Sequence, residues 1–161
     1  MKKIFLVAVA GGYLGAAFAH GEGMSAKKEV RPLSAREFSF GREGDAKKAT
    51  RIVSVGMADS MRFTPSSLTV KRGETIKFVV RNNGKVKHEM VIGTMKDLKE
   101  HAEMMKKHPG MEHDDPYMAH VAPGRTETII WQFTREGTYY YGCLEPGHFE
   151  TGMIGKVEVV K

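Results

Sequence analysis

The chain has 161 residues, enough for one domain and hardly enough for two. It carries 25 Lys and Arg against 19 Asp and Glu, a net charge of +6, with basic and acidic residues interleaved along the sequence. Because the basic residues form no block, we expect no binding to nucleic acid.

The first nineteen residues have the pattern of a signal peptide. Lys2 and Lys3 precede an apolar stretch, and Ala17-Phe18-Ala19 is a small-residue cleavage site. A membrane anchor is the alternative, but glycines interrupt the apolar stretch, which is shorter than the roughly 20 residues that a span requires. We therefore expect cleavage after Ala19, export, and a mature chain that is not held in a membrane.

Residues 20–50 are expected to form a polar, flexible arm that precedes the folded domain at residues 51–161. Phe38 and Phe40 are the only aromatic residues of this arm. We expect them to hold one short segment against the domain.

From Arg51 onward, apolar and polar residues alternate with the period of two that is typical of strands. Seven such segments, separated by turn residues, are 51–57, 68–70, 75–81, 88–92, 126–134, 138–143 and 155–160. Short strands joined by turns predict an all-β fold, an antiparallel Greek-key sandwich or barrel.

One long connection interrupts this series of strands. The segment from Lys96 to His108 has helix-forming composition, and Pro109-Gly110 ends it. The chain from there to Val121 is expected to be loop. Long connections in compact domains often carry function.

The only cysteine, Cys143, is followed by His148 and Met153 at intervals of five residues. In an oxidising compartment an unpaired thiol is a liability unless something occupies it, and its polar neighbours argue against an inert core cysteine. A thiolate, an imidazole and a thioether on one loop suit copper, which alternates between soft Cu(I) and harder Cu(II). A trigonal site of this kind needs a second histidine, and His88 is the candidate.

Taken alone, His88 would be interpreted as a histidine at a strand end whose hydrogen bonds are satisfied, and Met153 as a core residue that starts the last strand. Together, the order, spacing and strand context resemble the cupredoxins, the family of plastocyanin, azurin and pseudoazurin, and within it the periplasmic copper-resistance cupredoxins of bacteria. The resemblance covers residues 51–161 and rests on the segments Gly73–Phe78, His88–Gly93, Tyr140–His148 and Gly152–Val157.

This resemblance implies one type 1 copper site. His88, Cys143 and His148 would be its equatorial ligands, and Met153 its axial ligand. Many members of the family have an asparagine directly after the first histidine, whereas this chain has Glu89. The hydrogen bonds around the sulfur, which tune such a site, are therefore expected to differ.

Methionine and histidine are concentrated between positions 95 and 120. The residues that offer further, weaker copper ligands are His101, Met104, Met105, His108, Met111, His113, Met118 and His120. The first four share one face of the expected helix, and thioethers suit Cu(I) while imidazoles bind either oxidation state. The alternative is an amphipathic helix whose methionines pack against the sandwich.

His20, the expected new N-terminus, would offer its amine and imidazole as a chelating pair for Cu(II). The favoured alternative is that this histidine follows the cleavage site by chance, because the arm is expected to be disordered.

The resemblance and the donor-rich segment together favour a periplasmic copper-tolerance protein with a redox-active type 1 site. A soluble electron carrier and a Met/His-based copper chaperone are the alternatives. We expect no enzyme, since Gly142 and Leu144 flank Cys143 where multicopper oxidases and copper nitrite reductases place a histidine. We expect a monomer whose partners are copper ions and a periplasmic redox or copper-handling protein.

Overall fold

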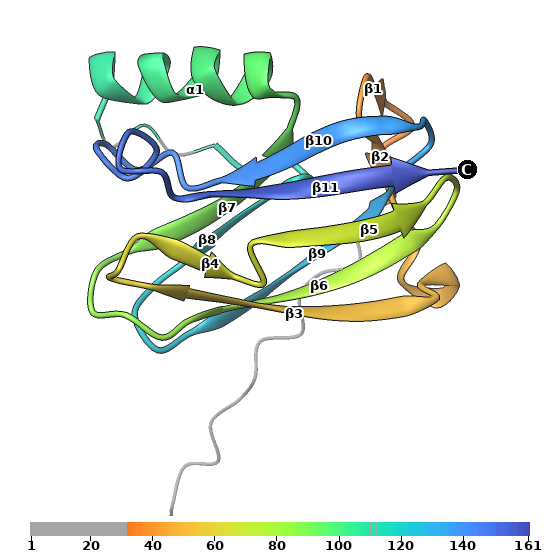
Figure 1. The fold of residues 1–161 in the computed structure, drawn as a ribbon, viewed down its shortest axis with the longest axis horizontal. Coiled ribbons are helices and arrows are strands. Elements are labelled where there is room, and N and C mark those ends of the chain that lie inside the picture. The colour runs from red at the N-terminus through yellow and green to blue at the C-terminus, as the bar shows by residue number, and fades with distance from the viewer. Residues whose placement is uncertain (1–31, 110, 112) are drawn as a thin grey trace, which may run out of the picture. The chain divides into compact units, whose positions relative to one another are not determined.

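The protein is described here by a computed structural model, which places residues 32–109, 111 and 113–161. The described chain is mostly β-structure, with one α-helix and one short 3-10 helix (Figure 1). In chain order the elements are β1 (Glu37–Phe38), β2 (Gly41–Glu43), η1 (Ala46–Lys48), β3 (Arg51–Ala58), β4 (Arg62–Thr64), β5 (Ser67–Lys71), β6 (Thr75–Asn82), β7 (His88–Gly93), α1 (Met95–Lys107), β8 (Met118–Val121), β9 (Thr126–Gln132), β10 (Gly137–Gly142) and β11 (Ile154–Val160).

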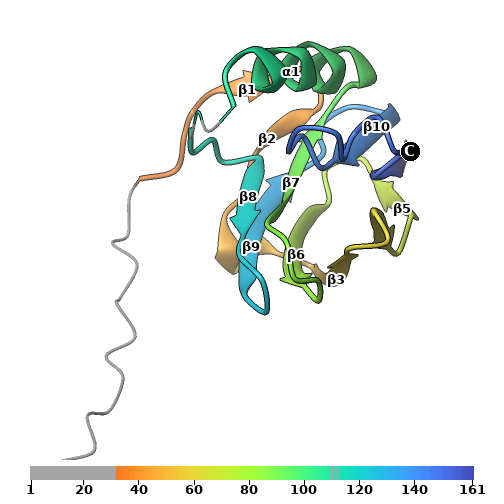
Figure 2. The same ribbon diagram turned by 90° about the vertical axis from the view of Figure 1, so that its left-hand side faces the viewer.

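The strands form two sheets that face each other (Figures 1 and 2). One sheet has the order β1-β2-β9-β6-β3-β4, and the other has the order β5-β11-β10-β7-β8. The expected all-β sandwich is confirmed. Two neighbouring pairs, β3 with β6 and β5 with β11, are parallel, so the expectation of a purely antiparallel fold was wrong in this detail.

The main core lies between the two sheets, because alternate residues of each strand point inward. The largest fully buried side chains include Trp131, Phe78, Phe133 and Tyr141. The phenol of Tyr141 donates a hydrogen bond to the carbonyl of Pro65 at 2.6 Å, which satisfies the only polar atom of that side chain.

All seven expected strands are present, as β3, β5, β6, β7, β9, β10 and β11. The expectation that the chain is loop up to Val121 was wrong at its end, since residues 118–121 form β8. β8 pairs with β7 in the register Met90 opposite Ala119 and buries Met118 and Val121. These four residues have little strand propensity of their own, and their pairing with β7 is what makes them a strand.

Residues 37–48, which belong to the segment expected as a polar arm, contribute β1, β2 and η1. β2 pairs with β9 in the larger sheet. The ring of Phe40 stacks on Trp131 with 5.2 Å between centroids, and the indole N–H of Trp131 donates to the carbonyl of Phe40 at 3.0 Å. The expected signal peptide and His20 lie outside the described residues.

The expected helix is confirmed as α1. It begins with a capping box, in which the side chain of Thr94 accepts from the backbone N–H of Asp97 and Asp97 accepts from the backbone of Thr94. Its buried residues, Leu98, Ala102 and Met105, recur at the spacing of one helix face. Figures 1 and 2 show α1 along the outside of the five-stranded sheet, above the loop between β10 and β11.

This helix and the loop share a second, smaller core. It consists of Val91, Leu98, Ala102, Met105, Met118 and Leu144. Among the described residues, no helix is both long enough and apolar enough to cross a bilayer.

Candidate metal centre

The residues expected to bind copper lie at one end of the five-stranded sheet. His88 is the first residue of β7, and Cys143 directly follows β10. β7 and β10 are antiparallel neighbours, so the start of one strand meets the end of the other. Residues 143–153, the ligand loop, connect β10 to β11 and carry His148 and Met153.

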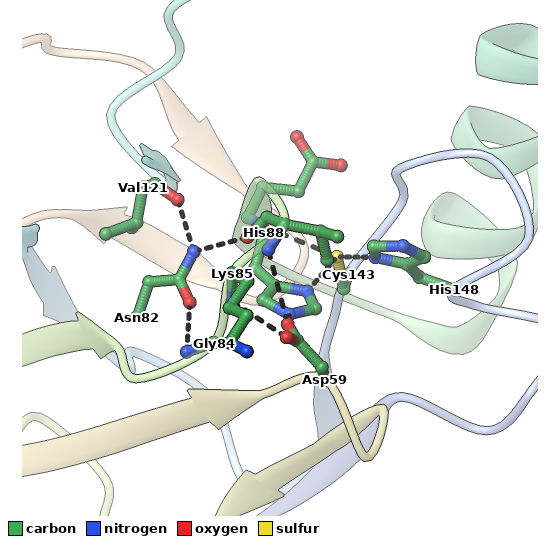
Figure 3. A network of polar contacts seen from close by, with 10 residues as sticks. Asp59, Asn82, Gly84, Lys85, His88, Val121, Cys143 and His148 are labelled. Carbon is green, nitrogen blue, oxygen red and sulfur yellow. Dashed lines mark hydrogen bonds and ion pairs between the residues drawn. The ribbon is translucent and has the colours of Figure 1, made fainter. Parts of the chain in front are cut away.

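Three donor atoms converge at this end. The Sγ atom of Cys143 lies 3.2 Å from Nδ1 of His148 and 3.9 Å from Nδ1 of His88. All three atoms lie within 4.8 Å of one another. Figure 3 shows the sulfur between the two imidazole rings. His88 and Cys143 are fully buried, whereas His148 is half-buried.

The ligand loop is closed by its own backbone. The N–H of Cys143 donates to the carbonyl of Met153 at 3.1 Å, and the N–H of Met153 donates to the carbonyl of His148 at 3.1 Å. Gly147 and Gly152 have φ angles of 88° and 87°, a conformation that costs glycine little. The side chain of Met153 is fully buried and belongs to the main core.

Asp59, which the sequence analysis did not single out, orients His88. Its Oδ1 lies 3.2 Å from Nε2 of His88 (Figure 3). The backbone N–H of Lys85, 2.8 Å from Oδ2, is the largest cause of a pKa of Asp59 below its usual value, and His88 contributes. An ionised carboxylate only accepts, so Nε2 of His88 carries the proton and the lone pair of Nδ1 faces the sulfur.

Burial raises the pKa of the Cys143 thiol to about 12, although the N–H of Glu89 donates to Sγ at 3.4 Å and opposes the shift. The thiol is therefore neutral at pH 7 until a cation replaces its proton. Burial, and then the neighbouring His88, lower the pKa of His148. A neutral imidazole is the form that binds a metal.

Glu89 is a fully buried carboxylate beside these donors. Its Oε1 accepts from the backbone N–H of Leu144 at 2.8 Å, and its Oε2 lies 3.1 Å from Nδ1 of His120. The contact with Glu89 raises the pKa of His120 to about 9, against the opposite effect of burial. Glu89 thus bonds to the ligand loop. Glu89, His120 and Glu145 also form a second group of possible metal donors.

The structure separates the expected donors of the Met/His segment. Met105 and Met118 are residues of the smaller core. Met105 lies on the buried face of α1, and Met118 is a buried residue of β8. Met104, His108 and Met111 are exposed. Of the residues expected to share one helix face, His101 alone is half-buried, and its ring stacks on His113 with 4.6 Å between centroids.

The donor set fits copper better than other common biological metals, because it combines one thiolate with two imidazoles and a methionine close by. Residues 49–160 match the family described as copper-binding proteins of the plastocyanin/azurin family. The chain belongs to this family. Its copper-binding fold is thus established, and the expected resemblance to the cupredoxins is confirmed.

Relatives of this chain carry copper-resistance names. This chain is 52% identical over 120 residues to the copper-resistant cuproprotein CopI of Rubrivivax gelatinosus. The aligned region covers 74% of this chain and 73% of that protein. This chain is 34% identical over 113 residues to the protein of the same name from Vibrio cholerae. That aligned region covers 70% of this chain and 67% of the relative.

Solved cupredoxin structures share the fold. The auracyanin of Roseiflexus castenholzii superimposes with a TM-score of 0.60 at 23% identity, over 70% of this chain and 98% of that one.

Proposed function

We propose that this protein is an exported copper-tolerance cupredoxin that holds one copper ion at a type 1 site. The observation that supports this most strongly is the convergence of Sγ of Cys143 with the Nδ1 atoms of His88 and His148 in a largely buried place. Met153 would be the axial ligand. The names of the relatives from Rubrivivax gelatinosus and Vibrio cholerae support a role in copper tolerance.

Copper in this site would supply a centre that accepts and returns one electron. The protein contributes a rigid arrangement of donors. His88 sits on a strand of which every residue is buried, and Asp59 holds its ring. Cys143 is tied to Met153 through the base of the loop. Donors held this way move little between oxidation states, which favours fast electron exchange.

The signal-peptide pattern of residues 1–19 supports export, and in a bacterium the destination would be the periplasm. We propose a binding and redox role without catalytic turnover, because Gly142 and Leu144 flank Cys143 in the sequence and neither could ligate a second metal.

A soluble electron carrier is the second candidate. The observation in its favour is that His148 alone among the three converging donors is half-buried, so its ring edge offers a route for electrons to a docked partner. A carrier and a tolerance protein would share the same site.

Absorption spectroscopy of the copper-loaded mature protein tests the site. We expect an intense thiolate-to-Cu(II) charge-transfer band in the visible region, and we expect Cys143→Ser to remove it while the fold is retained. A serine variant that kept the band would overturn the ligand assignment.

Growth of a bacterial host in copper tests the role. Deletion of the gene should lower the copper concentration that the host tolerates, and a Cys143→Ser copy should fail to restore it. If the serine copy restored full tolerance, copper handling would not depend on this site. Loss of respiration at ordinary copper levels, without loss of tolerance, would favour the carrier.

A further inference from the structure

His101 on α1 and His113 on the following loop form a pair that the proposed type 1 site does not use. Their Nε2 atoms lie 2.8 Å apart, and their rings are stacked. One Nε2 must donate and the other accept, so a single proton lies between them. Two imidazole nitrogens this close together can also share one metal ion when that proton leaves and the rings adjust.

Each ring of the pair has a feature that favours metal binding. Burial, and then the charge of His113, lower the pKa of His101. The Nδ1 atom of His113 is buried and has no hydrogen-bond partner within the part of the chain that the structure describes. An unpaired buried nitrogen is destabilising, and such atoms are uncommon unless a site has a use for them.

The pair lines a cavity of about 430 Å³ between α1, β1 and β7. Met104 lines the same cavity and adds a thioether. Three carboxylates, Asp97, Glu100 and Asp115, line it together with one guanidinium, so its wall has a net negative charge. Two imidazoles and a thioether suit copper in either oxidation state, and the carboxylates attract the cation to the opening.

We propose that His101 and His113, with Met104 as a third donor, bind a second copper ion in this cavity. The proposal rests on the type 1 assignment only for the identity of the metal. It narrows the eight donors expected from the sequence to three, because the others lie in the core or outside this cavity.

The second site is connected to the first through two side chains. His120 contacts the carbonyl of His113 through Nε2 at 3.0 Å and Oε2 of Glu89 through Nδ1 at 3.1 Å. Glu89 in turn contacts Leu144 and the sulfur of Cys143. A copper ion caught at the open cavity would therefore lie a short chain of contacts away from the type 1 donors.

Copper stoichiometry of the metal-free mature protein tests this. The protein is titrated with Cu(I) without oxygen against a chromophoric chelator, and separately with Cu(II). We expect the double variant His101→Ala/His113→Ala to bind one equivalent fewer than the parent protein. Its thiolate charge-transfer band should remain, which shows that the variant is folded and that the type 1 site is intact.

Two further variants make the result specific. His108→Ala removes an exposed imidazole from the C-terminal end of the same helix and should leave the stoichiometry unchanged. Met104→Leu should weaken Cu(I) binding at the second site more than Cu(II) binding, because a thioether prefers the softer ion. In Cys143→Ser the band should be lost while the second equivalent still binds.

Equal stoichiometry in the parent protein and the double variant would overturn the second site, as would the same loss in His108→Ala. A pair that took up zinc but no copper would also overturn it. Absence of the charge-transfer band from the parent protein would count against the type 1 site instead, so the two proposals fail separately.

Discussion

Glu89 is a carboxylate with no solvent exposure, next in sequence to a proposed copper ligand. One of its oxygens accepts from the N–H of Leu144 and the other contacts His120, while its own N–H donates to the Cys143 sulfur. Hydrogen bonds to the sulfur and to the loop that carries it tune such a centre. The residue that departs from the resembled family thus contacts both the sulfur and the loop of the proposed metal site.

Replacing Glu89 tests how much its carboxylate contributes to the stability of the domain. Glu89→Ala breaks the ion pair with His120 and leaves the buried N–H of Leu144 without its acceptor, so the free energy of unfolding of the metal-free protein should fall by roughly 3–5 kcal/mol. Glu89→Gln keeps an acceptor for Leu144 and should cost about 1–3 kcal/mol. Urea unfolding measures both.

Glu127→Gln changes an exposed carboxylate on β9 in the same way and should alter stability by at most about 0.5 kcal/mol. In the copper-loaded protein, Glu89→Gln should shift the charge-transfer band and Glu127→Gln should not. An unshifted band would show that Glu89 does not influence the sulfur.

At the residue scale, the sequence predicts donors best where they are close together in it. Cys143, His148 and Met153 share one loop, so their spacing alone indicates a metal. Asp59 was missed because it lies 29 positions before His88 and carries no local signal. Met105 was ambiguous between metal donor and core residue, because a helix face of methionines serves either role.

At the scale of elements, α1 covers the ligand loop. Leu98 is almost fully buried between the helix, β7 and Leu144. Lys106 on the helix contacts Glu150 on the loop at 2.7 Å. The helix, although inserted between two strands of the sandwich, therefore helps to hold the loop that carries His148 and Met153.

Leu98→Ala should lower the free energy of unfolding by about 2–5 kcal/mol, since it opens a cavity in the smaller core. Lys99→Ala, at the neighbouring exposed position of α1, serves as the control, with a change of at most about 0.5 kcal/mol. Thermal or urea unfolding of the metal-free proteins gives the comparison. A loss as small as that of the control would show that α1 contributes little to the stability of the domain.

The same scale shows which elements a local pattern can predict. The seven strands of five to eight residues are long enough, and rich enough in apolar and aromatic residues, to be recognised from the sequence. β1, β2, β4 and β8 have two to four residues each, so their identity as strands comes from the partner they pair with. The parallel pairing of β3 with β6 was also missed, because the sequence of a strand does not show in which direction its partner runs.

At the scale of the whole domain, the residues before Arg51 complete the larger sheet. β1 and β2 form its edge, and Phe40 closes one end of the core against Trp131 and Tyr117. The aromatic pair and the bond from the indole N–H to the carbonyl of Phe40 indicate that this segment belongs to the cooperative unit.

Phe40→Ala should therefore lower the free energy of unfolding by roughly 3–5 kcal/mol and change the fluorescence of Trp131, the only tryptophan. Leu33→Ala, at a side chain that is 51% exposed, should change neither. If Phe40→Ala behaved like Leu33→Ala, the domain would begin at residue 51, as the alternation pattern suggested.

The position of β11 has a consequence for the order of events. β11 is the last strand in the chain, yet it lies inside its sheet between β5 and β10, and the ligand loop closes only when Met153 at its head has bonded back to Cys143. While the polypeptide is still being synthesised or translocated, the ligand loop is open and the metal site is not yet formed. We therefore expect the metal to be acquired only once β11 has paired in its sheet, from the supply that surrounds the folded domain.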